Sequence, residues 1–133
     1  MHLTGRIAGI MAGVAVLFRN AEGQRQIEKV PDPLVSIRPE TAANLGLAEG
    51  DWAVISTPHG AIRQRVHITD VMSPGTVDAQ HSWWFPARNA KLPDLSGAFD
   101  FNANMLCPDE PEFCSLEIGS WPHMALMCRM EKE

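Results

Sequence analysis

The stretch "LVSIRPETAANLGLAEGDWAVISTPHGAIRQRVHIT" (34–69) decides the fold, because strand-like and turn-like segments alternate along it without interruption. The apolar residues of "LVSI" favour a strand. Pro39 suits a first helical turn, where its missing N–H costs no hydrogen bond, and Gly46 suits a helix end. A Gly-Asp turn (50–51) leads into a second strand, "WAVIST", and "PHG" (58–60) makes a tight turn. The stretch therefore predicts a strand, one or two turns of helix and a β-hairpin.

The second strand of that hairpin, "AIRQRVHIT" (61–69), alternates as a half-buried strand does. Its apolar side carries Ile62, Val66 and Ile68, interrupted by Gln64. Its polar side carries Arg63, Arg65, His67 and Thr69. The two arginines stand at i, i+2 and so share one strand face. A solvated surface and contact with an anionic ligand are both compatible with this spacing.

Outward from this stretch, the chain continues as short strands and one long loop. A turn at 73–75 precedes "TVDAQ", and the segment 124–131 alternates enough to be a closing strand. Five to seven short strands with a short helix predict a mainly β protein, and a small closed barrel removes exposed edges. The loop 87–123 is long for a compact domain, which favours a functional role. It carries four aromatic residues, Phe99, Phe101, Phe113 and Trp121, so we expect it to be ordered.

Composition limits the classes of function. A chain of 133 residues suits one domain, 1–133, and its net charge of −5 without a basic stripe argues against nucleic-acid binding. The apolar run "IAGIMAGVAVLF" (7–18) resembles part of a signal peptide, but it lacks an A-x-A site and is too short to span a bilayer. We favour a strand or a Gly-punctuated loop there, and we expect a cytoplasmic protein that does not contact membranes.

The cysteines do not form a recognisable metal or redox motif. Cys107, Cys114 and Cys128 lack C-x-x-C spacing, and a zinc set with His123 would need long, irregular gaps. Reduced cysteines are the simpler interpretation. The sequence also contains no G-x-S-x-G, no phosphate loop and no G-x-G-x-x-G. We therefore predict no catalytic and no metal-ligating residues in this chain.

Three short segments have the chemistry of a binding site. In "FNANML" (101–106), Asn102 and Asn104 would face the same way if the backbone is extended, and their amides suit the edge of a heterocycle. A turn in which each Asn bonds its own backbone is the plainer alternative. "LTGR" (3–6) could bring backbone amides and a guanidinium to a phosphate, or be a simple turn.

The third segment is "HSWWFP" (81–86). Adjacent strand residues point to opposite faces, so Trp83 and Trp84 cannot both enter one core. We predict that one ring is buried and that the other lies at an interface.

Taken together, these segments resemble the C-terminal molybdopterin guanine dinucleotide-binding domain of the dimethyl sulfoxide reductase superfamily, which comprises molybdenum or tungsten enzymes. "HSWWFP" and "EIGSWP" are most similar to the branch with thiosulfate and polysulfide reductase-like, acetylene hydratase-like and formate dehydrogenase-like proteins. The likeness covers nearly all of 31–132, with several motifs in the same order. It implies a six-stranded double-psi β barrel with one or two short helices and long loops.

The resemblance also implies which residues face the cofactor. Arginine and backbone groups would contact phosphate, and amides would contact pterin or guanine edges. The implied positions are Thr4, Gly5, Arg6, Arg25, Gln26, His81, Trp83, Trp84, Asn102, Asn104 and Leu106. Two features depart from the family: Cys107 replaces a threonine, and 7–24 is apolar and Gly-rich instead of polar and aromatic.

The domains that would ligate the metal are absent from this sequence. We therefore expect a cofactor-binding domain or small subunit that joins a catalytic subunit, with an orphaned apolar interface that favours self-association. A cofactor-free interaction barrel is an alternative. A pyruvoyl decarboxylase, formed by cleavage between Gly119 and Ser120, is a remote one.

Overall fold

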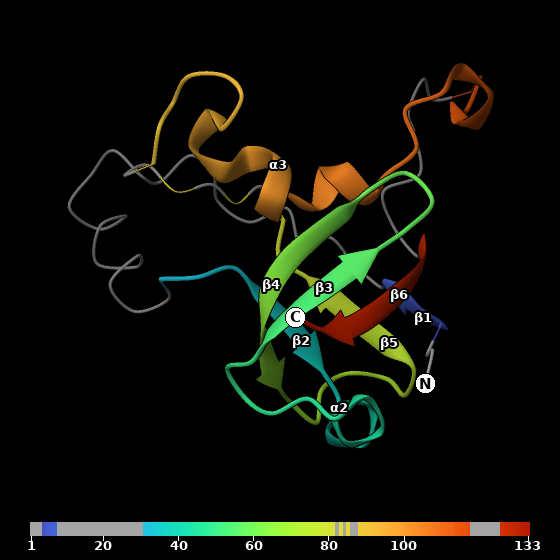
Figure 1. The fold of residues 1–133 in the computed structure, drawn as a ribbon. Coiled ribbons are helices and arrows are strands. Elements are labelled where there is room, and N and C mark those ends of the chain that lie inside the picture. The colour runs from blue at the N-terminus through green and yellow to red at the C-terminus, as the bar shows by residue number, and fades with distance from the viewer. Residues whose placement is uncertain (1–3, 8–30, 82, 84, 86–87, 118–125) are drawn as a thin grey trace.

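The computed structural model describes residues 4–7, 31–81, 83, 85, 88–117 and 126–133, and its architecture is mainly β, as predicted. The strands are β1 (Thr4–Ile7), β2 (Leu34–Ile37), β3 (Trp52–Ser56), β4 (Ala61–Ile68), β5 (Thr76–Ala79) and β6 (Leu126–Lys132). They form a closed barrel in the order β1-β5-β2-β4-β3-β6 (Figure 1).

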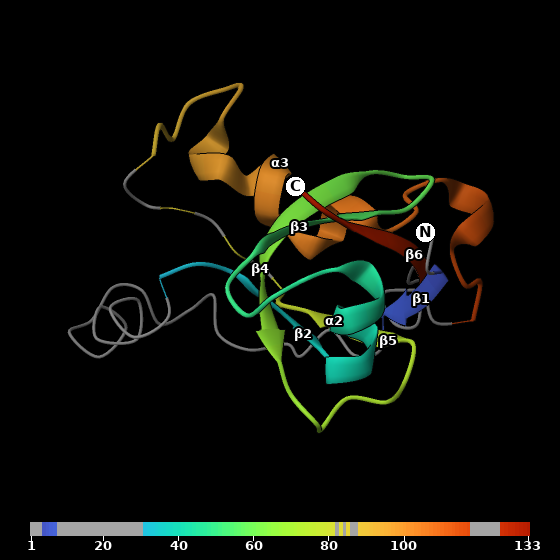
Figure 2. The same cartoon turned by 60° about the horizontal axis from the view of Figure 1, so that its bottom comes forward.

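Two of the six strand pairings around the barrel are parallel and four are antiparallel. β1 runs parallel to β5 and β2 runs parallel to β4, while the other neighbours are antiparallel. The predicted hairpin is confirmed, because β3 and β4 pair from Trp52 opposite Arg65 to Ser56 opposite Ala61. β6 lies between β1 and β3 and completes the closure (Figures 1 and 2).

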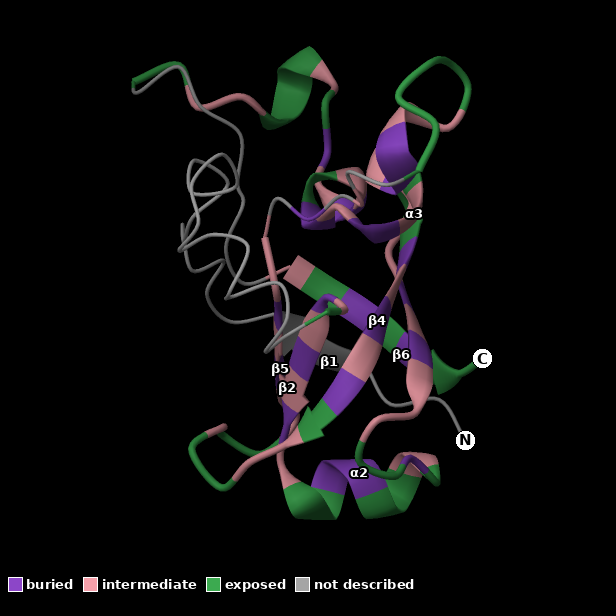
Figure 3. Ribbon diagram, turned by 90° about the vertical axis from the view of Figure 1, so that its left-hand side faces the viewer, coloured by how far each residue is buried: buried purple, intermediate pink, exposed green. Residues whose placement is uncertain are grey.

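One end of the barrel is closed by α2 (Pro39–Leu45) (Figure 3). The helix begins at Pro39, as predicted, and ends at Gly46, whose φ of 66° lies in the left-handed region that glycine adopts without strain. Gly46 and Leu47 donate their backbone N–H groups to the carbonyls of Ala43 and Ala42 at 3.2 and 2.9 Å. The local signals in 34–47 were therefore sufficient to define this end of the barrel.

The opposite end is covered by the long loop, which contains short helical turns (Figure 3). These are η1 (Leu95–Gly97), α3 (Ala98–Phe101), η2 (Ala103–Leu106) and η3 (Pro111–Phe113). Phe101 and Leu106 of this loop are buried against the barrel. These two side chains hold α3 and η2 on the barrel, whereas Phe99 and Phe113 are exposed and Trp121 lies outside the described residues.

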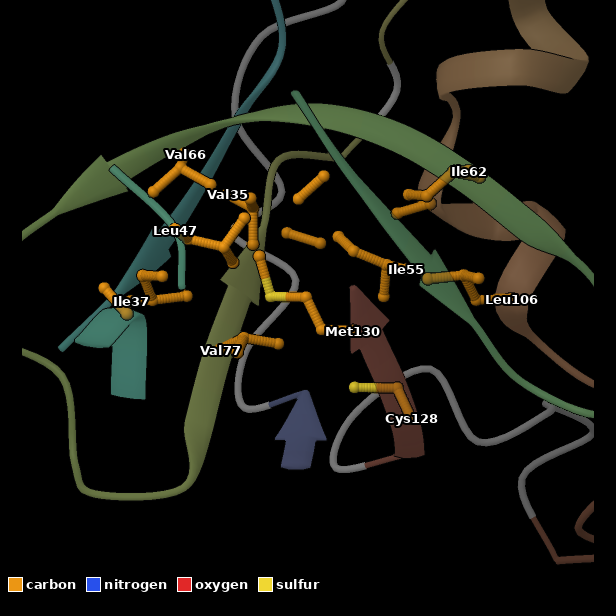
Figure 4. Packing of buried hydrophobic residues seen from close by; sticks show 14 residues of the cluster. Val35, Ile37, Leu47, Ile55, Ile62, Val66, Val77, Leu106, Cys128 and Met130 are labelled. Carbon is orange, nitrogen blue, oxygen red and sulfur yellow. The ribbon is translucent and has the colours of Figure 1, made fainter. Parts of the chain in front are cut away.

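The core follows from the alternation of the strands. On β4, Ile62 and Val66 are each 1% exposed, while Arg63 and Arg65 lie on the outer face. The barrel interior is filled by Val, Ile, Leu and Met side chains, with smaller Ala and Cys side chains between them (Figure 4). They come from β2, β3, β4, β5, β6, α2 and η2 and from Leu47. Fully burying such a side chain contributes roughly 1.5–3 kcal/mol. In the described part of the chain, no helix is both long enough and apolar enough to cross a membrane.

Candidate functional site

Two chain segments converge at the barrel end opposite α2. The first leaves β5 and passes through Gln80, His81 and Trp83, and the second is formed by α3 and η2. Figure 1 shows α3 and the turn after it above β4, at the end of the barrel that is remote from α2. This convergence brings His81 and the Asn102–Asn104 pair to the same end of the molecule, although they are about twenty residues apart in sequence.

Gln64 joins these two segments from inside the barrel. Its side chain is 0% exposed, and its Nε2 donates to the carbonyl oxygens of Gln80 at 2.8 Å and Phe101 at 3.3 Å. Its Oε1 accepts from the backbone N–H of Gln80 at 3.0 Å. The residue that interrupts the apolar side of β4 is thus fully buried and hydrogen-bonded. Its importance could have been suspected from an amide placed at an apolar position.

An aromatic cluster lies beside this junction. The rings of Phe85 and Phe101 meet edge to face at 4.9 Å between centroids, and those of Trp83 and Phe85 meet at 6.2 Å. Trp52 contacts Phe101 at 5.9 Å from the β3 side. Edge-to-face pairs add roughly 0.5–1.5 kcal/mol each beyond the area that they bury. Phe101 therefore anchors α3 to the outside of the barrel.

Three arginines surround this cluster, and each is paired with carboxylates. The guanidinium groups of Arg63 and Arg88 lie 5.3 and 5.6 Å from the centroid of the Phe101 ring, a cation–π arrangement. Asp100 lies between the two, at 3.7 Å from Arg63 and 3.4 Å from Arg88. Arg63 also binds Glu133 at 2.8 Å, and Trp52, Arg63, Phe101 and Glu133 line a hollow of about 240 Å³.

Arg65, two residues further along the same face of β4, is held in the same manner. It stacks 4.9 Å from the Trp52 ring centroid and binds Asp32 at 2.6 Å. A further bond joins it to the carbonyl oxygen of Gly50 at 2.7 Å. The two arginines of β4 are thus already occupied by protein partners, so the structure favours a structural role for them over contact with an anionic ligand.

Of the two alternatives for the asparagines, the structure shows the turn and not the extended backbone. Asn102 caps η2, and its Oδ1 accepts the backbone N–H of Asn104 at 3.0 Å. The segment is therefore a turn, as in the plainer alternative, because an Asn side chain readily bonds the backbone two residues on. The side chain of Asn104 is exposed and that of Asn102 is half-buried. Both amides remain on the surface of this end of the barrel.

Leu106 differs from the other expected site residues. Its side chain is 1% exposed and belongs to the barrel core. The hydroxyl of Thr57 donates to its carbonyl oxygen at 2.8 Å. Gly60 lies against the backbone of Met105 so closely that a Cβ at this position would collide with the carbonyl. The β3–β4 hairpin thus fixes η2 on the barrel.

Of the two adjacent tryptophans, Trp83 is among the residues that the structure describes. Trp83 is 8% exposed, which confirms that one ring of the pair is buried, and Trp84 lies outside the described residues. His81 is half-buried beside Gln80. The alternation of strand side chains could not say which ring is buried, because Pro86 and the turn after Gln80 interrupt the regular strand register.

The first expected contact segment is a strand, and not a loop or turn. Residues 4–7 form β1, with Arg6 opposite Thr76 of β5 and Gly5 opposite Cys128 of β6. Pairing with strands far along the chain produces this conformation, which local sequence does not reveal. Arg25 and Gln26 lie outside the described residues, as do Gly119, Ser120 and His123.

The cysteines are all free thiols. Burial raises the pKa of the Cys128 thiol to about 11 and also raises that of Cys107. Among the described residues, no cluster of three or more His, Cys, Asp or Glu side chains could hold a metal ion.

Comparisons with known proteins agree with the resemblance. A family model described as "Molydopterin dinucleotide binding domain" matches residues 9–116. Dopamine dehydroxylase from Eggerthella lenta is 38% identical over 56 residues, which are 42% of this chain and 6% of that protein. Acetylene hydratase from Syntrophotalea acetylenica is 32% identical over 81 residues, which are 60% of this chain and 11% of that protein.

The fold is shared with a solved structure as well. Acetylene hydratase from Pelobacter acetylenicus superposes with a TM-score of 0.83 at 22% identity, covering 98% of this chain and 18% of that one. The chain thus spans a small part of the relatives that it matches, and the likeness to this structure concerns the fold. Since the family model covers most of the 133 residues, the chain belongs to the family of molybdopterin dinucleotide-binding domains.

Proposed function

We propose that this chain binds the guanine dinucleotide form of the molybdopterin cofactor as one part of a larger molybdenum or tungsten oxidoreductase. The observation that carries the proposal is the family match over residues 9–116. The match covers only 6% and 11% of the lengths of two relatives, which supports a cofactor-binding part whose remaining domains or catalytic subunit lie elsewhere. We further propose that the barrel is of the double-psi type, with its two parallel strand pairs as support.

The residues at the α3 end fit part of such a cofactor. The exposed amide of Asn104 and the half-buried Asn102 offer both donors and acceptors, which guanine and pterin edges require. His81 adds a ring nitrogen at the same end. We assign phosphate contacts to the segment containing Thr4, Gly5 and Arg6, and to Arg25 and Gln26. The bound cofactor would supply the redox chemistry, and this chain would hold and orient the dinucleotide.

Titration of the full chain with guanosine diphosphate tests the nucleotide half of this proposal. We expect a saturable change in tryptophan fluorescence with a Kd on the order of 0.1–1 mM, since much of the contact surface lies outside this chain. Amide NMR shifts should concentrate at His81, Asn102 and Asn104. Adenosine diphosphate should bind less tightly, because its edge has a different donor and acceptor pattern.

The matched variants are Asn104→Ala in the site and Asn44→Ala on α2, at the other end of the barrel. The first should weaken binding and the second should not. No response to guanosine diphosphate at millimolar concentration would oppose the proposal and favour a cofactor-free interaction barrel. A neighbouring reading frame that encodes metal-ligating domains would support a separate subunit. A cytoplasmic location stays a prediction.

A further inference from the structure

Gln64 places a polar amide at a buried, otherwise apolar position of the barrel interior. Its neighbours on the interior side of β4, Ile62 and Val66, are buried apolar side chains, and Gln64 itself is 0% exposed. Burying an amide without hydrogen bonds is unfavourable, because the group loses its bonds to water and gains none in return. The partners of this amide therefore explain its presence in the barrel.

Those partners belong to two segments, which are also joined where the Phe85 N–H donates to the carbonyl oxygen of Ser96 at 2.8 Å and the Phe85 and Phe101 rings meet at 4.9 Å. Gln64 Nε2 donates to the carbonyl oxygens of Gln80 and Phe101, at 2.8 and 3.3 Å. Gln64 Oε1 accepts from the N–H of Gln80 at 3.0 Å. Gln80 directly precedes His81, and Phe101 directly precedes Asn102. One side chain thus bridges the residues that lead into both halves of the candidate site.

We propose that Gln64 is a positioning residue that sets the spacing between the segment of His81 and Trp83 and the segment of Asn102 and Asn104. This inference rests on the proposed function, because it assigns both segments to the dinucleotide. A planar heterocycle held by groups from both segments binds well only if those groups keep a fixed separation. Gln64 contributes to that fixed separation from inside the barrel, beside the Phe85–Ser96 hydrogen bond and the Phe85–Phe101 ring contact, without touching the ligand.

Other contacts keep the barrel itself together without this amide. The N–H of Gln80 also donates to the carbonyl oxygen of Leu34 at 3.0 Å, and the Gln80 side chain accepts from the N–H of Leu34 at 3.0 Å. The bond from Thr57 to Leu106 still fastens η2. Loss of the Gln64 amide should therefore loosen the relation between the two segments more than it unfolds the protein.

The test replaces Gln64 by methionine, which is similar in length and lacks the amide. The control is Val66→Ala, which creates a cavity on the same interior face of β4 without touching either segment. Urea is added to the more stable variant until both have the same free energy of unfolding. Amide hydrogen exchange of Gln80, Asn102 and Met105, and the Kd for guanosine diphosphate, are then measured on both.

We expect Gln64→Met to speed exchange at those three amides about tenfold relative to the control. We also expect it to raise the Kd about tenfold, while Val66→Ala stays within about twofold of wild type. If both variants change exchange and Kd alike, Gln64 acts through stability alone and the inference is overturned. If wild type binds the nucleotide and Gln64→Met binds equally well, the inference fails while the proposed function stands.

A third measurement covers the remaining cases. In the wild-type chain, the side-chain amide protons of Gln64 should exchange at least about a hundredfold more slowly than those of an exposed glutamine. Free exchange would overturn the inference even if Gln64→Met does not fold. A third outcome combines slow exchange of the Gln64 side chain, faster backbone exchange of both segments in Gln64→Met, and no nucleotide binding by wild type. In that case the proposed function fails, while Gln64 remains the bridge between the two segments.

Discussion

At the scale of single residues, the carboxyl group of Asp78 on β5 lies in a partly buried environment. Within the part of the chain that the structure describes, its Oδ1 is buried and has no hydrogen-bond partner. Burial raises the pKa of this carboxyl above its usual range. A raised pKa means that the folded state disfavours the ionised form more than the unfolded state does. Ionised Asp78 therefore destabilises the fold at neutral pH, and this cost disappears as the pH falls toward the unfolded pKa.

We predict that Asp78→Asn is more stable than wild type at pH 7. The group is only partly buried, so the gain should be on the order of 1 kcal/mol or less, or a rise in Tm of about 2–4 °C. Thermal unfolding followed by circular dichroism at pH 7 and at pH 3.5 measures it. The difference should vanish at the lower pH, where both side chains are neutral. Asp109→Asn, at an exposed position, is the control and should change the Tm little at either pH.

The cysteines also differ in a measurable way. Cys128 is 3% exposed, and burial raises its pKa to about 11, so few molecules carry a thiolate there at pH 8. Cys114 is only half-buried. We predict that iodoacetamide labels Cys114 first and Cys128 only after unfolding, as peptide mass spectrometry would show. Labelling of native Cys128 at the rate of Cys114 would contradict the buried position of β6.

At the scale of elements, α3 is a short helix that depends on one side chain. Phe101 is 6% exposed and contacts Phe85, Trp52 and two guanidinium groups. A four-residue helix has little stability of its own, because nucleation is unfavourable. Tertiary packing of Phe101 therefore holds α3 on the barrel.

We predict that Phe101→Ala lowers the free energy of unfolding by about 3–5 kcal/mol, measured by urea denaturation. Phe99→Ala provides a matched control in the same helix, because Phe99 is 47% exposed. Its cost should stay below about 1 kcal/mol. Equal losses in the two variants would mean that α3 is not anchored through Phe101.

At the scale of the whole molecule, several large apolar side chains are exposed. Leu116 is 99% exposed and Phe113 is 46% exposed, both in the loop at the α3 end, while Val71, 89% exposed, lies in the turn between β4 and β5. Exposed apolar groups of this kind favour association. Because the chain spans a small part of the relatives that it matches, we propose these side chains as candidates for contacts with other parts of a larger protein or with a second copy.

We predict concentration-dependent self-association, seen as faster sedimentation in analytical ultracentrifugation. The double change Phe113→Ser with Leu116→Ser should reduce it, whereas Val71→Ser should reduce it less, because Val71 is remote from the α3 end. A monodisperse monomer at high concentration would contradict the expectation of an orphaned interface.

Local signals predicted a large part of the fold. The strand and helix bounds in 34–69 came from proline, glycine and alternation, which act over a few residues and need no distant partner. The same alternation identified the buried side of β4. The resemblance then supplied the motif positions, and the family match over 9–116 confirmed the family.

The remaining features depended on contacts between distant segments. The conformation of residues 4–7 is set by pairing with β5 and β6. The geometry of Asn102 and Asn104 is set by the N-cap of η2, and Leu106 is buried because η2 packs its side chain into the barrel core. Gln64 shows the difference most clearly. The sequence by itself determined an amide on an apolar strand face, and only the tertiary structure decided that its partners are Gln80 and Phe101. The physical reason is that a buried amide must find its hydrogen bonds in whatever segments the fold brings next to it.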